Sequence, residues 1–246
     1  MDDISDAERA LRVELAGLYR VFDHLGWAEL IYNHISARVP ESDCFLINPY
    51  GLHYNEVTAS NLVKVDPEGN VVGESEHPIN PAGFVIHSAV HAVRHDVLCV
   101  AHTHTTAGSV VAAQPLGLRA DNFYSCIVAD WIAYHDFEGI TVRDGEKERL
   151  VANLGDKHLM ILRSHGLLTC GSTVAACFMN MWVLQRACEI QVAVDAGNVP
   201  PLPVSPAARE ASAKGLKVMM AQRGYGELEL AAMMRQVDRV DASYRE

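Results

Sequence analysis

The stretch Cys99-Val100-Ala101-His102-Thr103-His104 carries an apolar run directly into two histidines that are two residues apart. A short apolar run of this kind is typical of a buried strand. Alternate residues of a strand face the same side, about 6–7 Å apart, so His102 and His104 can converge on one ion. Another apolar run lies on either side of His165, which Gly166 follows, and this glycine permits a sharp turn. Three imidazoles can form a divalent-metal site with one position open for water or substrate.

The composition is that of an ordinary globular chain. Hydrophobic residues make up 49% of the 246 residues, which is sufficient for the core of one large α/β domain. The formal net charge is −11 and no basic cluster occurs, which argues against nucleic acid as a partner. The acidic N-terminus lacks a signal-peptide pattern, and no apolar window is long enough to span a membrane. We therefore expect a cytoplasmic protein without a membrane partner, with six cysteines that act as buried thiols.

Hydrophobic periodicity and turn signals predict alternating helices and short strands. We expect helices over 6–26, 80–95, 105–113, 147–154 and 173–196, and strands over 35–38, 45–47, 62–66, 71–72, 97–102, 126–129, 132–134, 158–162 and 167–170. Short turns between neighbouring strands favour a three-layer α/β/α domain with a central mixed or mainly antiparallel sheet. A proline-rich break near residue 200 separates this domain (1–200) from a C-terminal helical extension (201–246) that packs on the domain or on a neighbouring subunit.

The remaining histidines fall into two groups. His87, His91 and His95 share one face of the helix expected over 80–95. His87 and His91 could bind metal as an HxxxH pair, but we expect His91 and His95 to fill a partly buried helix face. His87 stays a candidate because it lies nearest the start of the helix. Surface or capping roles are expected for the other six: His24, His34, His53, His77, His135 and His158. Of these, His135 could lie near a site, since the neighbouring Asp136 could fix its tautomer.

Several common catalytic patterns are missing from the sequence. It contains no GxGxxG, no GxxxxGK[ST] and no GxSxG segment. Hydride transfer, nucleotide hydrolysis and the nucleophile elbow of the α/β-hydrolases therefore have no sequence support.

Five motifs, taken in order, resemble the class II aldolase/adducin superfamily over residues 11–196. They are Tyr32-Asn33-His34-Ile35-Ser36-Ala37-Arg38, Asn48-Pro49-Tyr50-Gly51, Asn80-Pro81-Ala82-Gly83, His102-Thr103-His104 and Ser164-His165-Gly166-Leu167-Leu168-Thr169-Cys170-Gly171. Within the superfamily the match is similar above all to the adducin head domain, in Gly26-Trp27, in Glu56-Val57-Thr58-Ala59-Ser60 and in the Phe84 that follows Gly83.

This resemblance implies a class II aldolase-like fold and a symmetric homotetramer with active sites at subunit interfaces. It also implies that His102, His104 and His165 hold zinc or a similar divalent ion, which polarises the carbonyl of a small-molecule substrate while a carbon–carbon bond is made or cleaved. Histidine ligands accept Fe, Mn, Co and Ni as well as Zn, so zinc is expected but these metals stay open. The matching motifs imply substrate contacts from Asn33, Ser36, Asn48, Gly51 and Gly83.

Two departures from the family pattern bear on the chemistry. Gly83 stands where the aldolases have a glutamate that acts as acid and base, so no carboxylate comes from that position. The phosphate-binding motifs are also altered, in Tyr32-Asn33-His34-Ile35-Ser36 and in Pro49-Tyr50-Gly51, which argues against a sugar-phosphate substrate. Acid–base work would then need a substitute, with His87, Tyr134, His135 or metal-bound water as candidates.

Three functions remain open on these grounds. The first is a metal-dependent lyase, epimerase or decarboxylase acting on a small carbonyl or hydroxy-acid substrate. The second is a non-haem iron oxygenase on the same fold, since an open three-histidine site can bind Fe(II). The third is a non-catalytic binding or scaffold domain of the adducin-head type.

Overall fold

The fold is built on a seven-stranded sheet in the order β3-β2-β1-β4-β7-β6-β5. The computed structural model describes residues 4–139, 145–197, 200–221 and 224–246. The strands are β1 (His34–Arg38), β2 (Phe45–Ile47), β3 (Val63–Val65), β4 (Cys99–Thr103), β5 (Ile132–His135), β6 (Leu159–Leu162) and β7 (Gly166–Gly171). All neighbours pair antiparallel except β5 and β6, which are parallel. The expected α/β fold with a mixed, mainly antiparallel sheet is therefore confirmed.

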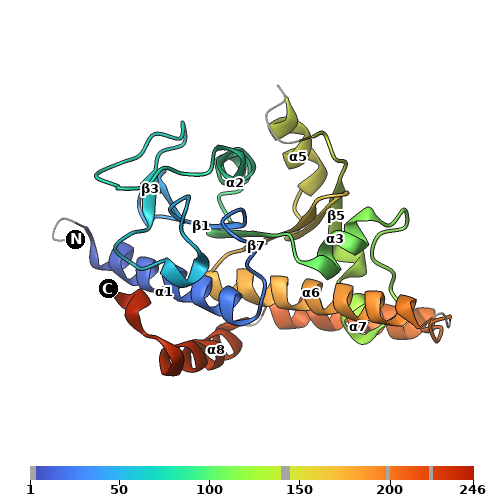
Figure 1. The fold of residues 1–246 in the computed structure, drawn as a ribbon. Coiled ribbons are helices and arrows are strands. Elements are labelled where there is room, and N and C mark those ends of the chain that lie inside the picture. Colours follow the sequence, from blue (N-terminus) through green and yellow to red (C-terminus); the bar gives the residue numbers. More distant parts are fainter. Residues whose placement is uncertain (1–3, 140–144, 198–199, 222–223) are drawn as a thin grey trace.

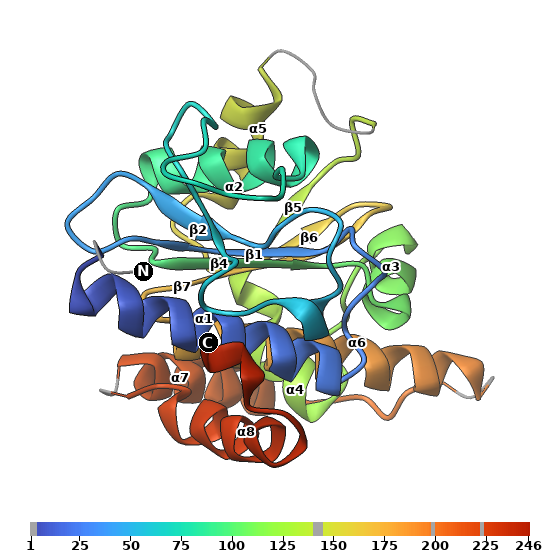
Figure 2. The same cartoon turned by 60° about the vertical axis from the view of Figure 1, so that its left-hand side comes forward.

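Helices cover both faces of the sheet, as Figures 1 and 2 show. One face carries α2 (Pro81–Val93) and α5 (Glu146–Leu154), and the other carries α1 (Asp6–His24) and α6 (Val174–Ala196). The remaining helices are α3 (Thr106–Ala113), α4 (Phe123–Val128), α7 (Pro206–Ala221) and α8 (Glu227–Val240), with short 3-10 turns η1 (Tyr54–Glu56), η2 (Ala129–Trp131) and η3 (Ser243–Arg245). None of the helices in the described ranges is long and apolar enough to span a bilayer.

Strand β4 shows how the sequence pattern builds the two cores. Cys99 and Ala101 pack into the core beneath the sheet, whereas Val100 packs into the core under α2 and α5. This alternation turns His102 toward the α2 side, and Thr103 points the other way and donates a hydrogen bond to Met181. The two-residue alternation of β4 therefore places His102 on the face of the sheet that α2 covers, where a metal site can form.

One expected strand is a helix. Residues 126–129 read as extended because Cys126-Ile127-Val128 is a short apolar run, but α4 covers most of this segment. Asn122 caps the helix, since its side chain accepts a hydrogen bond from Ser125 N while the Ser125 hydroxyl accepts one from Asn122 N. The helix then packs against α6 and α7. Capping and tertiary packing thus override the local preference for strand.

The described part of the C-terminal segment contains two helices, α7 and α8, and the short turn η3. In this chain α7 packs against α4, and α8 packs against α1 and α6 (Figure 2). The division into a domain over 1–200 and an extension over 201–246 stays a prediction.

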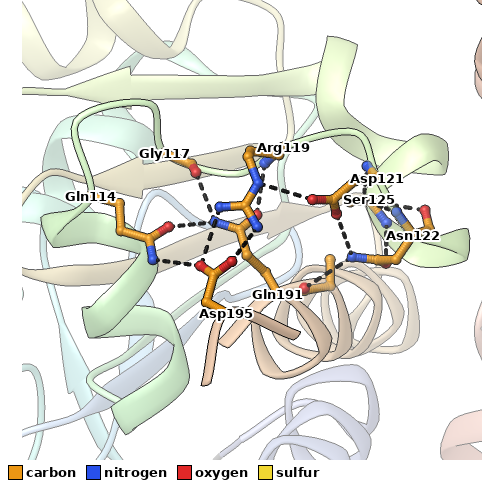
Figure 3. Close-up of polar contacts among 9 residues, drawn as sticks. Gln114, Gly117, Arg119, Asp121, Asn122, Ser125, Gln191 and Asp195 are labelled. Atoms are coloured by element: carbon orange, nitrogen blue, oxygen red, sulfur yellow. Dashed lines mark hydrogen bonds and ion pairs between the residues drawn. The ribbon is translucent and has the colours of Figure 1, made fainter. Parts of the chain in front are cut away.

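A polar cluster fixes the connection between α3 and α4 onto α6 (Figure 3). The side-chain amide of Gln191, on α6, is fully buried; it accepts from Arg119 N at 2.8 Å and donates to Gly117 O at 3.0 Å. Asp195, one helical turn further on, receives Arg119 through both guanidinium NH groups at 2.6 and 3.2 Å. The connection is therefore held by one buried amide and one ion pair at the surface.

Replacing Gln191 with leucine should lower the free energy of unfolding by about 1–3 kcal/mol, because it leaves the Arg119 N–H and the Gly117 C=O buried without partners. Urea unfolding would measure the change. The matched change Asp195→Asn weakens an ion pair whose side chains are 28% and 35% exposed, so it should cost less than about 1 kcal/mol. Equal losses in the two variants would contradict this assignment.

Candidate metal centre

The antiparallel pairing of β4 with β7 brings the three predicted histidines together. His102 lies opposite Leu168 in this pairing, His104 follows the end of β4, and His165 immediately precedes β7. The Nε2 atoms of His102 and His104 are 2.7 Å apart, and those of His104 and His165 are 2.9 Å apart. The structure therefore forms one cluster of ligand atoms from residues 102, 104 and 165.

The turn before β7 has the glycine that a close approach of backbones requires. A Cβ on Gly166 would collide with the carbonyl oxygen of Thr103. The preceding Ser164 has a positive φ of 55°, a strained conformation for a residue with a side chain. Together these two residues let the chain reverse just beside β4, which places His165 against His104.

Hydrogen bonds set the tautomers of two of the histidines. His102 Nδ1 donates to the carbonyl oxygen of Leu167 at 2.8 Å, and His104 Nδ1 donates to the Glu29 carboxylate at 2.6 Å. Because both partners can only accept, each Nδ1 carries the proton and each Nε2 keeps a free lone pair. Outer partners of this kind are typical of metal-binding histidines. The sequence did not reveal Glu29, which lies 75 positions before His104.

Burial keeps His102 and His165 neutral, as metal ligands must be. The pKa of His102 lies well below its ordinary value because the ring is buried, with further lowering by His165 and His104. Burial and the neighbouring His104 lower the pKa of His165 to about 4. In a tetrahedral zinc site adjacent ligand nitrogens are about 3.3 Å apart, so Nε2 atoms now 2.7–2.9 Å apart need only spread slightly. The donor set fits zinc or a similar divalent ion.

A cavity of about 660 Å³ opens in front of the three histidines. Its size lies in the range of small-molecule sites. Aromatic and aliphatic side chains form much of its wall, among them Tyr32, Tyr50, Ile86 and Phe137, and Glu29 and Ser109 also reach it. The cluster of imidazoles therefore faces a space in which a small molecule can bind.

A chain of buried hydrogen bonds leads from this cavity into the layer under α2. His34 Nδ1 lies 2.9 Å from His87 Nε2, and His87 Nδ1 lies 2.6 Å from the Ser36 hydroxyl. That hydroxyl is also 2.8 Å from His91 Nε2. All four residues are buried. The helix α2 is thus joined to β1 by a continuous polar chain.

The structure corrects the expectation for His34. We expected a surface or capping role, but His34 is the first residue of β1, is buried, and lines the cavity. His87 lies behind it and does not appear in the described lining. The expectation for His95 was wrong: it does not fill a partly buried helix face but is exposed and lies beyond the end of α2. Burial lowers the pKa of His34 and His87 well below the ordinary value, and burial with Arg38 lowers that of His91 to about 3. The chain is therefore neutral at neutral pH.

The five residues predicted to bind substrate lie just behind the described cavity wall, to which their sequence neighbours Tyr32, His34, Tyr50 and Ala82 contribute. Asn33 donates to Trp27 O at 2.8 Å, and Asn48 accepts from the Tyr19 hydroxyl at 3.0 Å. Ser36 is part of the histidine chain, Gly51 adopts a positive φ of 108°, and Gly83 packs against His34. Their contact with substrate stays a prediction.

Tyr134 and His135, the other two candidates for acid–base work, lie on β5. The Tyr134 hydroxyl accepts from Leu118 N at 3.1 Å, and Arg163 lies over its ring. His135 is bound through Nδ1 to the Asn153 amide at 2.9 Å and lines a small neighbouring cavity to which His165 also contributes. Neither residue is part of the described lining in front of the three histidines.

Comparisons with known proteins agree with this geometry. Residues 13–192 match the family described as "Class II Aldolase and Adducin N-terminal domain". A Pseudomonas aeruginosa protein with the name "Putative aldolase class 2 protein" is 46% identical, over 99% of this chain and 95% of its own length. Mouse alpha-adducin is 47% identical over 75% of this chain, which spans only 26% of that protein.

A solved structure extends the agreement to the whole fold. The crystal structure of an aldolase II superfamily protein from Pseudomonas syringae is 42% identical with a TM-score of 0.95, covering 100% of this chain and 98% of that one. The resemblance found in the five motifs is thereby confirmed, and the chain belongs to the class II aldolase and adducin family.

Proposed function

We propose that this protein is a metal-dependent enzyme, a lyase, epimerase or decarboxylase, that acts on a small carbonyl or hydroxy-acid substrate. The observation that carries the proposal is the convergence of three imidazoles on a cavity large enough for such a molecule. Zinc is the proposed resident ion, because three histidines with an open position are a common catalytic zinc site. Iron, manganese, cobalt and nickel remain alternatives for the same ligands.

The division of labour among the residues follows from their contacts. His102, His104 and His165 would hold the ion, which supplies polarisation of a carbonyl oxygen when bound. Glu29 and the Leu167 carbonyl hold two of the rings by their Nδ1 protons. The aromatic walls given by Tyr32, Tyr50 and Phe137 would shield the carbon skeleton of the substrate from water.

Two other functions are distinguished by experiment. A non-haem iron oxygenase would use the same three ligands with Fe(II) and would turn over carbonyl or hydroxy-acid substrates only in air. A binding or scaffold domain is favoured by the similarity to alpha-adducin, but such a domain has no need of an open cavity at the imidazoles. Aerobic and anaerobic screens of aldehydes, keto acids and hydroxy acids therefore separate the three.

We further propose that the protein works in the cytoplasm as a homo-oligomer, a tetramer by the family resemblance. Leu116 and Phe123 support an association, since these apolar side chains are 80% and 71% exposed in the single chain. Light scattering of the purified protein measures the oligomer directly.

Protein purified without chelators should contain about one divalent ion per chain, and His102→Ala should lose it. The reason is that His102 is the most buried of the three ligands and that two imidazoles bind far more weakly than three. Elemental analysis measures the metal content, with His95→Ala, an exposed histidine, as the control. Full occupancy in His102→Ala would show that the ligand set is misassigned.

Replacing Glu29 with glutamine should lower the metal affinity by roughly tenfold, the smaller end of the range for outer partners of metal-binding histidines, because the carboxylate is half exposed. The Glu29–His104 hydrogen bond then loses its negative acceptor, which makes Nε2 a weaker donor to the ion. Competition with a chromophoric chelator measures the affinity. Glu68→Gln, in an exposed turn, should leave it unchanged; an equal loss in both variants would contradict the role of Glu29.

A further inference from the structure

His34 stands apart from the other members of the buried chain, because it also borders the cavity. Its Nδ1 is used by His87, and no hydrogen bond to its Nε2 occurs among the described residues. The His34 ring centroid lies 5.0 Å from that of His102, so a molecule held at the three ligands comes within reach of His34. The ring is thus a polar group next to the position where a substrate would react.

Gly83 provides the space that this ring occupies. A Cβ on Gly83 would lie 2.7 Å from both Cγ and Nε2 of His34. Both atoms belong to a ring held between His87 and His102, so the ring could not move aside cheaply. Any residue other than glycine at the third position of α2 would therefore displace the imidazole.

The hydrogen-bond chain behind His34 couples its tautomer to the orientation of the Ser36 hydroxyl. The Ser36 hydroxyl has one proton, so it donates to one of its two histidines and accepts from the other. When it donates to His91, it accepts from His87 Nδ1, and His87 Nε2 then accepts from His34 Nδ1. In that arrangement His34 Nε2 has a free lone pair toward the cavity. In the reverse arrangement Nε2 carries a proton that it can donate.

We propose that His34 is the residue that exchanges a proton with the substrate, and that His87, Ser36 and His91 are positioning residues that hold its tautomer. This inference rests on the proposed metal-dependent function. In the step assigned to His34, the C–H bond next to the substrate carbonyl breaks and its proton forms an N–H bond at Nε2. The electron pair of the broken bond moves onto the carbonyl oxygen, and the reverse step returns the proton to carbon.

Hydrogen–deuterium exchange into small carbonyl compounds tests this step. Zinc-loaded protein in D2O is mixed with hydroxyacetone, glycolaldehyde or pyruvate, and loss of the proton signals next to the carbonyl is followed by NMR. His34→Ala should slow the enzyme-dependent exchange at least about 100-fold, the lower end for acid–base groups. Its zinc affinity should stay within about threefold, because His34 is not a ligand. His95→Ala should exchange at the rate of the unchanged protein.

Glycine variants test the placement of the ring without removing it. Gly83→Ala should slow exchange while His34 is still present, because the new Cβ pushes the imidazole out of position. Gly215→Ala is the matched control, since that helical glycine has open space around it. Equal exchange by Gly83→Ala and Gly215→Ala would overturn the placement of His34.

The positioning residues are tested on the metal-free protein, independently of turnover. With 15N-labelled histidine, the slowly exchanging ring N–H signals of the chain should be present, and Ser36→Ala should lose the signal of whichever of His87 and His91 donates to the Ser36 hydroxyl. Unchanged signals in that variant would overturn the assigned chain.

Different results would overturn the role of His34 and the proposed metal-dependent function. A His34→Ala variant that exchanges like the unchanged protein, or zinc-loaded unchanged protein that exchanges none of the three probes, overturns the role of His34. The proposed function fails by a different result, namely that the unchanged protein does not retain a divalent ion.

Discussion

The contact on which the site depends is the close approach of β7 to the end of β4. Gly166 packs against the carbonyl of Thr103 with no room for a side chain, and Ser164 takes a strained conformation to reverse the chain there. Without this approach His165 would not reach His104, and the cluster would be reduced to two histidines on one strand. The strain of the turn is offset by the antiparallel pairing of the two strands, which runs over five residue pairs in the middle of the sheet.

Burial of the imidazoles affects both the packing of the site and its chemistry. Removing imidazoles from water disfavours their charged form, so His102, His34 and His87 all have pKa values well below the ordinary range. A group of neutral rings can be packed closely, and each ring that finds a partner satisfies its polar atoms. The same neutrality leaves lone pairs available for an ion and for a proton. The buried histidines are therefore both part of a packed interior and available to hold an ion or a proton.

The sequence predicted the parts of this structure that depend on local pattern. The period of β4 and the Ser164-His165-Gly166 turn were sufficient to predict that His102, His104 and His165 form one group, and most helices and strands follow from hydrophobic spacing. The sequence did not predict features that depend on contacts with residues far away in the chain. His34 follows a loop and is separated from His87 by 53 positions, so neither its burial nor its place at the cavity was visible. Likewise the segment 126–129 becomes helical through the Asn122 cap and its packing on α6 and α7.

The site has the His34 imidazole where the family resemblance implies a glutamate carboxylate, and this difference changes the charge of the site. The resemblance places a glutamate at position 83, but in this chain the His34 ring fills the space in front of Gly83. A divalent ion held by the three histidines, as proposed, would bring two positive charges, and the half-exposed Glu29 would offset only one of them. A glutamate in the cavity would offset the second, whereas a neutral imidazole leaves it. An unbalanced positive charge in a cavity with apolar walls favours a substrate that brings one negative charge of its own. A keto acid or hydroxy acid meets that requirement with its carboxylate, and a neutral aldehyde does not.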